Sequence, residues 1–196
     1  MNNHTFIIGI TGGSGCGKTT LLNLIRDKGG LVLDCDAIYH ELLKTDKAML
    51  SAIDARFPGV MEDGVLNRKK LGSIVFADAQ ALLDLNTITH KAVKEEVLRR
   101  LESGPKLAAI DAIALFEGGL AELCHVTVAV TAPVEDRVAR LMKRDGISED
   151  YARSRIAAQH EEDWFREKCG YILENNSNLD AFATKCLAFL AYIGIM

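Results

Sequence analysis

Short apolar runs alternate along the chain with longer segments of helical periodicity. The runs are continuous and end at polar residues, a pattern typical of strands buried on both faces of a parallel sheet. We expect strands at Phe6–Ile10, Leu31–Leu33, Leu107–Ile110, Val126–Thr131 and Tyr171–Leu173. We expect helices at Lys18–Lys28, Ala37–Leu43, Lys47–Phe57, Arg68–Phe76, Asp78–Leu101, Val134–Arg144, Ser148–Lys168 and Leu179–Ile193. The alternation predicts a three-layer α/β domain with a five-stranded parallel sheet.

The uneven spacing of these strands indicates two excursions from the sheet. The segment between the second and third strands is far longer than the dozen or so residues that a plain crossover needs. We therefore expect residues 37–103 to form a helical insertion beyond the carboxyl ends of the strands. A second helical excursion, residues 134–168, follows the fourth strand. Residues 1–36, 104–133 and 169–196 would then form the core.

Composition adds limits to this picture. The chain has 196 residues, 26% of them charged, and a net charge of −4. These values suit a water-soluble protein and give no reason to expect nucleic acid or a membrane surface as a partner, so any anionic ligand needs a local basic cluster. The five cysteines are scattered and the residues Met1–Thr5 lack the pattern of a secretory signal. Both features predict reduced thiols in a cytoplasmic protein.

A phosphate-binding loop carries the clearest chemical signal. Gly12–Thr19 fits G-x-x-x-x-G-K-[ST], follows an apolar run and opens a helical pattern. In such a loop the backbone N–H groups surround the phosphates, Lys18 reaches the β- and γ-phosphates, and Thr19 offers its hydroxyl to Mg²⁺. A dinucleotide-binding interpretation fails because Lys18 stands where the last glycine is needed. The residues expected to bind ATP in this segment are Gly13, Ser14, Gly15, Cys16, Gly17, Lys18, Thr19 and Thr20.

Two carboxylates follow the second strand, at Asp34 and Asp36. At the carboxyl end of a strand beside the loop they would face the γ-phosphate. One could accept the proton of an acceptor hydroxyl, and the other could organise Mg²⁺ through water. For Asp36, capping of the helix Ala37–Leu43 is an equally good interpretation. A GTPase is disfavoured, because no N-K-x-D motif occurs near the later strands.

Several further motifs occur in order over nearly the whole chain, in the segments Thr11–Thr19, Asp34–Ile38, Gly64–Phe76, Leu85–His90, Ala114–Glu117, Arg140–Ser148 and Arg155–Gln159. Together these segments resemble the sequence pattern of the dephospho-CoA kinase family. The chain departs from the family pattern in three places. Lys91 replaces a proline, Ile113 and Ala114 fill positions around another expected proline, and Cys169–Ser177 lacks an aspartate and a final glycine.

The resemblance implies a P-loop NTPase fold, with residues 134–168 as a lid and residues 37–103 as the site for dephospho-CoA. It implies transfer of the γ-phosphoryl group of ATP to the ribose 3′-hydroxyl, with Mg²⁺. Asp36 would be the general base, Lys18 and Arg140 catalytic cations, and Arg140 and Arg144 lid contacts to ATP. Thr19 and Asp34 would serve the metal. The residues expected at the acceptor are Asp34, Asp36, Arg68, His90, Phe116 and Glu117.

Some interpretations remain open at the level of sequence. His90 could contact dephospho-CoA or anchor the insertion, and Glu117 could orient ribose or metal waters or cap a helix. Arg137 extends the face of Arg140 but is left out, because the family often has glutamine there. The alternatives for function are another nucleoside or nucleotide kinase, or a non-catalytic ATP-binding regulator. The protein would act as a monomer or small homo-oligomer.

Overall fold

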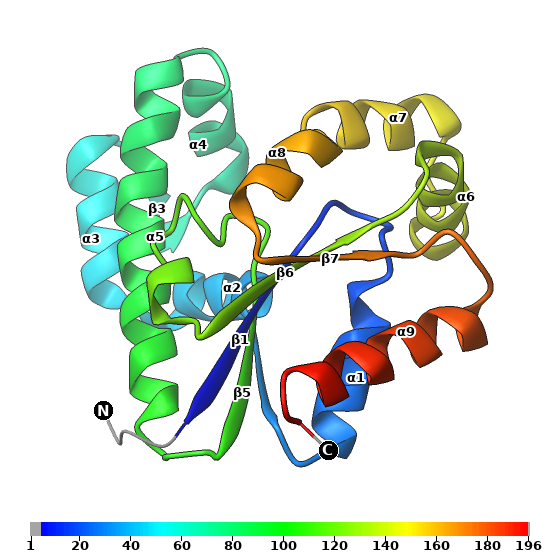
Figure 1. The fold of residues 1–196 in the computed structure, drawn as a ribbon. Helices are drawn as coiled ribbons and strands as arrows, with labels where there is room; N and C mark the ends of the chain where they lie inside the picture. Colours follow the sequence, from blue (N-terminus) through cyan, green and yellow to red (C-terminus); the bar gives the residue numbers. More distant parts are fainter. Residues whose placement is uncertain (1–4, 196) are drawn as a thin grey trace.

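A parallel sheet forms the centre of the computed structural model, which describes residues 5–195 (Figure 1). The sequence-based expectation for the amino-terminal residues therefore lies mostly outside the described part. The strands run in the order β2-β5-β1-β6-β7, and every neighbouring pair is parallel. Their bounds are β1 Phe6–Thr11, β2 Leu31–Asp34, β5 Leu107–Asp111, β6 Val126–Thr131 and β7 Tyr171–Glu174. The predicted five-stranded α/β fold is confirmed.

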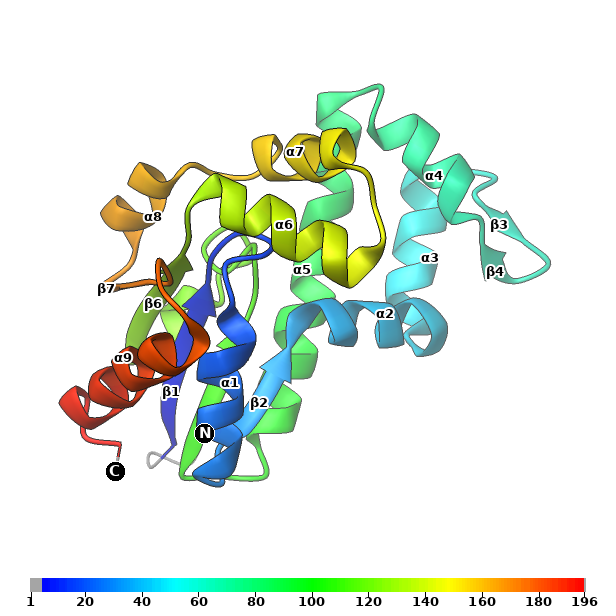
Figure 2. The same ribbon diagram turned by 90° about the vertical axis from the view of Figure 1, so that its right-hand side faces the viewer.

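Helices cover both faces of the sheet and extend past its carboxyl edge (Figures 1 and 2). The bounds are α1 Lys18–Asp27, α2 Cys35–Thr45, α3 Lys47–Arg56, α4 Arg68–Val75, α5 Ala79–Leu101, α6 Val134–Asp145, α7 Glu149–Ala157, α8 Glu162–Lys168 and α9 Leu179–Tyr192, with one 3₁₀ turn at Ala121–Leu123. Within residues 5–195 no helix combines the length and apolar character that crossing a membrane requires.

Alternation along the strands divides the core into two layers. In β1, Ile8 and Ile10 face α1 and α9, where they meet Leu21 and Phe182. Ile7, on the same strand, joins the cluster on the opposite face. Successive side chains of a strand point to opposite faces, so a strand that is apolar at every position is buried on both sides.

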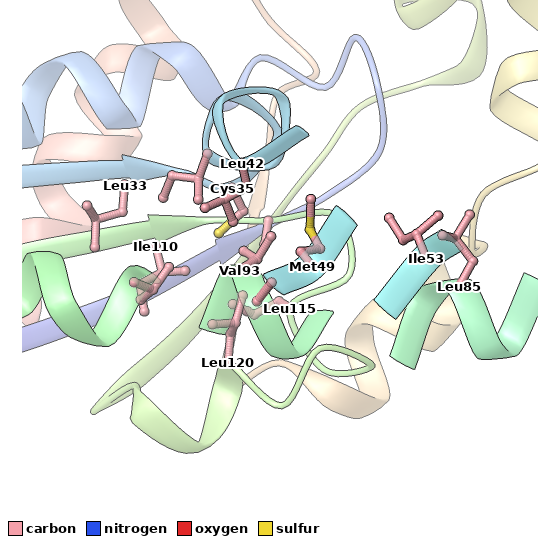
Figure 3. Packing of buried hydrophobic residues seen from close by; sticks show 14 of the residues in the cluster. Leu33, Cys35, Leu42, Met49, Ile53, Leu85, Val93, Ile110, Leu115 and Leu120 are labelled. Atoms are coloured by element: carbon pink, nitrogen blue, oxygen red, sulfur yellow. The ribbon is translucent and has the colours of Figure 1, made fainter. Parts of the chain in front are cut away.

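The segment that follows β2 shares the core of the sheet. The apolar cluster of Leu33 and Ile110 on the sheet continues through Cys35 and Met49 to Leu85 on α5 (Figure 3). Helices α2, α3 and α4 each pack on the long helix α5. Because this apolar contact is continuous, residues 37–103 do not form a core of their own but share the core beneath the sheet.

Two features differ from the sequence-based expectation. The predicted helix Ser148–Lys168 is divided into α7 and α8, because the chain turns at Gln159 and His160 to place their side chains against other segments. The insertion also contains a hairpin, β3 (Met61–Glu62) with β4 (Val65–Leu66). Asp63 and Gly64 form its turn, and both adopt positive φ. An Asp-Gly pair is a sequence signal for a tight hairpin.

Truncation of Leu115 should test the shared core. Leu115 belongs to the loop that follows β5 and is fully buried in this cluster, so Leu115→Ala should lower the free energy of unfolding by about 2–5 kcal/mol. The matched control is Leu83→Ala on α5, whose side chain is 58% exposed and whose loss should change stability by less than about 0.5 kcal/mol. Urea titration followed by circular dichroism measures both. Equal effects of the two substitutions would contradict this assignment of the core.

Candidate active site

The loop between β1 and α1 has the backbone geometry of an anion-binding turn. Gly12, Gly15 and Gly17 all adopt positive φ, which glycine tolerates without strain. At Gly12 a Cβ atom would lie 2.2 Å from the carbonyl oxygen of Val130, so only glycine fits between the loop and β6. The ammonium of Lys18 folds back over the loop and donates to the Gly12 carbonyl at 2.9 Å.

A cavity of about 680 Å³ opens above this loop. Its walls come from the loop, from the carboxyl ends of β2 and β5, and from α6 and α7. The expected residues that line it are Gly13, Ser14, Gly15, Gly17, Lys18, Thr19, Asp34, Asp36, Arg140 and Arg144. The fold thus brings together the predicted phosphate loop, carboxylates and arginines, because parallel strands end at one edge of the sheet.

The two carboxylates after β2 have different surroundings. Asp34 caps α2, since its side chain accepts a hydrogen bond from the Ala37 amide at 3.0 Å. The capping role considered for Asp36 therefore belongs to Asp34. Asp36 lies in the first turn of α2, is exposed, and lines both the large cavity and a second one.

This second cavity, of about 240 Å³, lies between α2, α5 and the loop after β5. We call it the acceptor cavity, after the role proposed for it below; Asp36, Tyr39, Asn86, Thr89 and His90 are the polar residues that line it. Burial lowers the pKa of His90, while Glu117 opposes this change. The imidazole is therefore neutral near pH 7 and can both donate and accept a hydrogen bond.

The structure adds a carboxylate that the sequence reasoning did not include among the site residues. Asp111 ends β5, in register with Asp34 of β2, and its Oδ1 lies 3.9 Å from the Lys18 ammonium. This buried oxygen has no hydrogen-bond partner in the described chain. Burial raises the pKa of Asp111 to about 6, with Lys18 lowering it and Asp34 and Asp36 raising it. The sequence feature that could have identified Asp111 as a site residue is its position directly after the apolar run Leu107–Ile110.

The oxygen atoms at this edge fit Mg²⁺ held jointly with phosphates. Asp34, Asp36, Asp111 and Thr19 all line the same cavity and offer carboxylate or hydroxyl oxygens, the donor type that Mg²⁺ prefers. Within residues 5–195 no group of three or more His, Cys, Asp or Glu side chains forms a metal-binding cluster. A Mg²⁺ ion here would therefore depend on water and phosphate oxygens for most of its ligands.

Side chains from α6 and from the turn after α7 lie directly on the phosphate loop. Arg140 donates to the Gly15 carbonyl at 3.1 Å, and Arg137 donates to the Ser14 carbonyl at 3.0 Å. Gln159 accepts from the Ser14 amide and donates to the Ser14 hydroxyl, both at 2.9 Å. The family pattern gave a reason to leave Arg137 out, yet it contacts the loop as closely as Arg140 does.

Asn175, after β7, supports the loop from below. Its side chain is buried and donates to the Cys16 carbonyl at 2.9 Å. The surrounding segment lacks the family's aspartate and glycine, but Asn175 itself is present.

Two residues expected to bind ATP have other surroundings. The side chain of Cys16, within the loop, is buried, and the amide of Thr20 donates to the Gly17 carbonyl. Neither Cys16 nor Thr20 lines the large cavity, so their expected contacts with ATP stay predictions.

The structure does not bring three of the expected acceptor residues to Asp36. The carboxylate of Glu117 pairs with the His160 imidazole at 2.6 Å, and Phe116 meets the edge of Trp164. Trp164 also stacks on His160, which makes it a packing residue of this turn. Arg68 lines a separate groove on the insertion. Of this group, His90 alone lines the acceptor cavity.

Comparison with known proteins gives a consistent result. The family model for dephospho-CoA kinase matches residues 6–181. A dephospho-CoA kinase of Moorella thermoacetica is 37% identical over 183 residues, covering 90% of this chain and 86% of that protein. One from Thermus thermophilus is 36% identical over 191 residues, covering 96% and 92% of the two chains.

Solved structures show the same fold. A Thermus thermophilus protein superposes with a TM-score of 0.81 at 33% identity, covering 97% of this chain and 99% of that one. A dephospho-CoA kinase from Campylobacter jejuni gives 0.65 at 22% identity, covering 96% and 97%. A shikimate kinase from Bacteroides thetaiotaomicron gives 0.58 at 13% identity, covering 96% and 98%, a likeness of fold alone.

The buried carboxylate of Asp111 should reduce the stability of the ligand-free protein. Unfolded, this group loses its proton near pH 3.8, whereas in the fold it holds the proton to about pH 6. The folded state binds more protons between these values, so stability falls as the pH rises through this window. Asp111→Asn removes the charge and should stabilise the protein by about 1–2 kcal/mol at pH 7.5, less than the full shift because Lys18 loses its partner.

Urea titrations at pH 7.5 and pH 5 measure this difference. The advantage of Asp111→Asn should shrink at pH 5, where folded Asp111 is already mostly protonated. The exposed Asp27→Asn at the far end of α1 serves as the control and should show no such pH dependence. A destabilised Asp111→Asn protein at pH 7.5 would contradict the assignment of Asp111 as a destabilising buried charge.

Proposed function

This chain belongs to the dephospho-CoA kinase family, and we propose that it transfers the γ-phosphoryl group of ATP to the ribose 3′-hydroxyl of dephospho-CoA, giving CoA and ADP. The observation that carries the proposal is the position of Asp36. This one carboxylate lines both the cavity above the phosphate loop and the acceptor cavity. An acceptor hydroxyl beside Asp36 would lie next to the ATP phosphates in the cavity above the loop. The rest of the acceptor molecule would have room in the acceptor cavity.

We propose the following roles for the donor side. The loop amides and Lys18 hold the β- and γ-phosphates, and Arg140 neutralises charge that spreads over the transferred group. Phosphoryl transfer needs little covalent help from the protein, so positioning and charge stabilisation account for most of the rate. Arg144, which donates two hydrogen bonds to Asp145, would turn toward the phosphates when residues 134–168 close as a lid.

For the acceptor side we propose that Asp36 is the general base. Its carboxylate accepts the proton of the 3′-hydroxyl as that oxygen forms a bond to the γ-phosphorus and the bond to the ADP oxygen breaks. Residues 37–103 would hold the rest of dephospho-CoA, with His90 in the acceptor cavity as a contact or an anchor. Phe116 and Glu117 would act indirectly, by holding the turn at His160 through packing and the hydrogen bond between Glu117 and His160.

Mg²⁺ is part of the proposal. Thr19, Asp34 and Asp111 would hold it, directly or through water, beside the phosphates, where it supplies positive charge to the phosphoryl group. The unpaired buried oxygen of Asp111 supports this assignment, because a cation would satisfy it. We also propose that the protein acts in the cytoplasm, since its five cysteines are all free thiols in the structure.

An assay of ADP release tests the function. ADP should appear at a rate that depends on dephospho-CoA, because an acceptor is needed to complete the transfer. The product should carry one added phosphate, detected by mass spectrometry. Equal ADP release without any acceptor would indicate an ATPase. No release under either condition would indicate a non-catalytic nucleotide-binding protein, and transfer only to another nucleoside or nucleotide would identify a different kinase.

Replacement of Asp36 tests its role as the base. Asp36→Asn should lower kcat by about 10²–10⁴-fold, the usual contribution of general base catalysis, while ATP binding measured by calorimetry changes little. The control is Asp27→Asn, the same change at an exposed position on the far end of α1, and it should retain normal turnover. Near-normal kcat in Asp36→Asn would remove Asp36 as the base and leave the overall reaction unaffected.

A further inference from the structure

Arg137, near the start of α6, has no part in the roles proposed above. Its guanidinium nevertheless donates to the Ser14 carbonyl at 3.0 Å and to the side-chain oxygen of Gln159 at 2.9 Å. We propose that Arg137 is a positioning residue for the phosphate donor. Together with Gln159 it fixes the loop at Ser14, so that the amide of Gly15 points at the triphosphate. The proposal rests on ATP as the donor and deepens the proposed function on that side.

Ser14 is held at each of its three polar groups. Gln159 accepts from the Ser14 amide and donates to the Ser14 hydroxyl, while Arg137 donates to the Ser14 carbonyl. The Gln159 oxygen that accepts from the amide also accepts from Arg137, so the guanidinium fixes which way the Gln159 side chain is turned. We call these two side chains the Ser14 clamp, because loss of either one removes a partner of the other.

The planar peptide between Ser14 and Gly15 carries this constraint to the cavity side of the loop. In a trans peptide the carbonyl and the next N–H point in opposite directions, and residues 5–195 contain no cis peptide. Since the Ser14 carbonyl is turned toward Arg137, the Gly15 amide is turned away from it. Gly15 lines the cavity above the loop, whereas Arg137 does not. The clamp therefore presents the Gly15 N–H to a phosphate, the kind of backbone donor that such loops use.

Close packing against α6 leaves the loop little freedom to shift. A Cβ atom on Gly13 would lie 2.2 Å from the Arg137 guanidinium, and one on Gly15 would lie 2.9 Å from the Arg137 carbonyl oxygen. Arg137 also lines, with Thr131 and Phe165, a space of only about 20 Å³, which is room for about one water molecule. The guanidinium thus has little space into which it could move away from Ser14.

Arg137 also brings positive charge that no carboxylate neutralises. Within residues 5–195 no Asp or Glu side chain forms an ion pair with it, unlike Arg140 and Arg144, which pair with acidic neighbours. The charge is felt inside the loop: burial raises the pKa of the Cys16 thiol, and Arg137 lowers it more than Lys18 does. A half-buried charge is screened less than an exposed one, so it attracts a triphosphate without touching it.

A loop held in this way is oriented before ATP arrives. Groups that are already in place stabilise the phosphates without a cost of reorganisation. If Ser14 were released, the Gly15 amide would adopt several orientations, and ATP would bind more weakly and with its γ-phosphate less well aligned. The binding of dephospho-CoA, assigned above to residues 37–103, would not change. Removal of Arg137 should therefore act on ATP alone.

Arg137→Ala tests this separation of the two substrates. The dissociation constant for ATP, measured by calorimetry, and KM for ATP should each rise tenfold or more. KM for dephospho-CoA at saturating ATP should stay within twofold of the wild-type value. The control is Arg99→Ala, because Arg99 is exposed on α5 and bonds only to Glu96, and it should keep all three constants. Unchanged ATP affinity in Arg137→Ala, or an equal rise in both KM values, would overturn the proposal.

A double-mutant cycle with Gln159→Ala tests the clamp itself. Both side chains act through Ser14, so the double variant should bind ATP no more than about threefold more weakly than the weaker single variant. Losses of affinity that multiply in the double variant would identify two independent contacts and contradict the clamp.

Arg137→Gln provides the test if Arg137→Ala does not fold, as thermal melting would reveal. The dephospho-CoA kinase family often has glutamine at this position, so the fold should accept it. Glutamine is neutral and shorter than arginine and cannot replace both hydrogen bonds, so the dissociation constant for ATP should rise threefold or more. Normal ATP affinity in this variant would show that neither the charge nor the guanidinium of Arg137 matters, contrary to the proposal.

These measurements separate the inference from the proposed function. Calorimetry with ATP needs no acceptor, so it decides the role of Arg137 whatever molecule accepts the phosphoryl group. A wild type that binds ATP but does not phosphorylate dephospho-CoA would refute the proposed function alone. A wild type that does so, with normal ATP affinity in the Arg137 variants, would refute only the inference about Arg137.

Discussion

The electrostatic interaction between Lys18 and Asp111 lies at the centre of this site. Lys18 is the first residue of α1 and Asp111 the last residue of β5, and their charged atoms are 3.9 Å apart. That separation exceeds a hydrogen bond, so Lys18 donates to Gly12 and the Asp111 oxygen stays unpaired within the described residues. Unpaired charges of this kind are typical of a nucleotide-binding site. Its charges are positioned in advance and lack complete partners until substrates arrive, at a cost in stability of the ligand-free fold.

The position of Asp36 depends on a different kind of interaction. Helices α2 to α4 add no separate core but extend the one beneath the sheet, through Leu33, Met49 and Leu85 (Figure 3). This continuity fixes Asp36 relative to the phosphate loop, because α2 begins immediately at the end of β2. The position of Asp36 beside the phosphate loop is thus set by packed side chains, whereas α6 and the turn after α7 contact the loop through hydrogen bonds of Arg137, Arg140 and Gln159.

Some elements of this structure could be predicted from the sequence and others could not. Strands and the phosphate loop were predictable, since their signals are local: continuous apolar runs, and glycines at fixed offsets from Lys18. The break between α7 and α8 was not, because it contains neither glycine nor proline. It forms because Gln159 reaches Ser14 and His160 reaches Glu117, contacts between residues far apart in the sequence. The hairpin at Asp63-Gly64 carried a readable signal that a purely helical view of the insertion overlooked.

The sequence by itself determined the class of fold, the triphosphate-binding loop and the carboxylate pair at Asp34 and Asp36, because each follows from residue types at fixed short spacing. Only the tertiary structure decided which of those carboxylates caps a helix and which faces two cavities. It also brought Asp111, Arg137 and Asn175 to the loop and placed Glu117 against His160 and Phe116 against Trp164. These outcomes depend on how strand ends and helices meet in space, and spacing along the chain does not encode such distances locally.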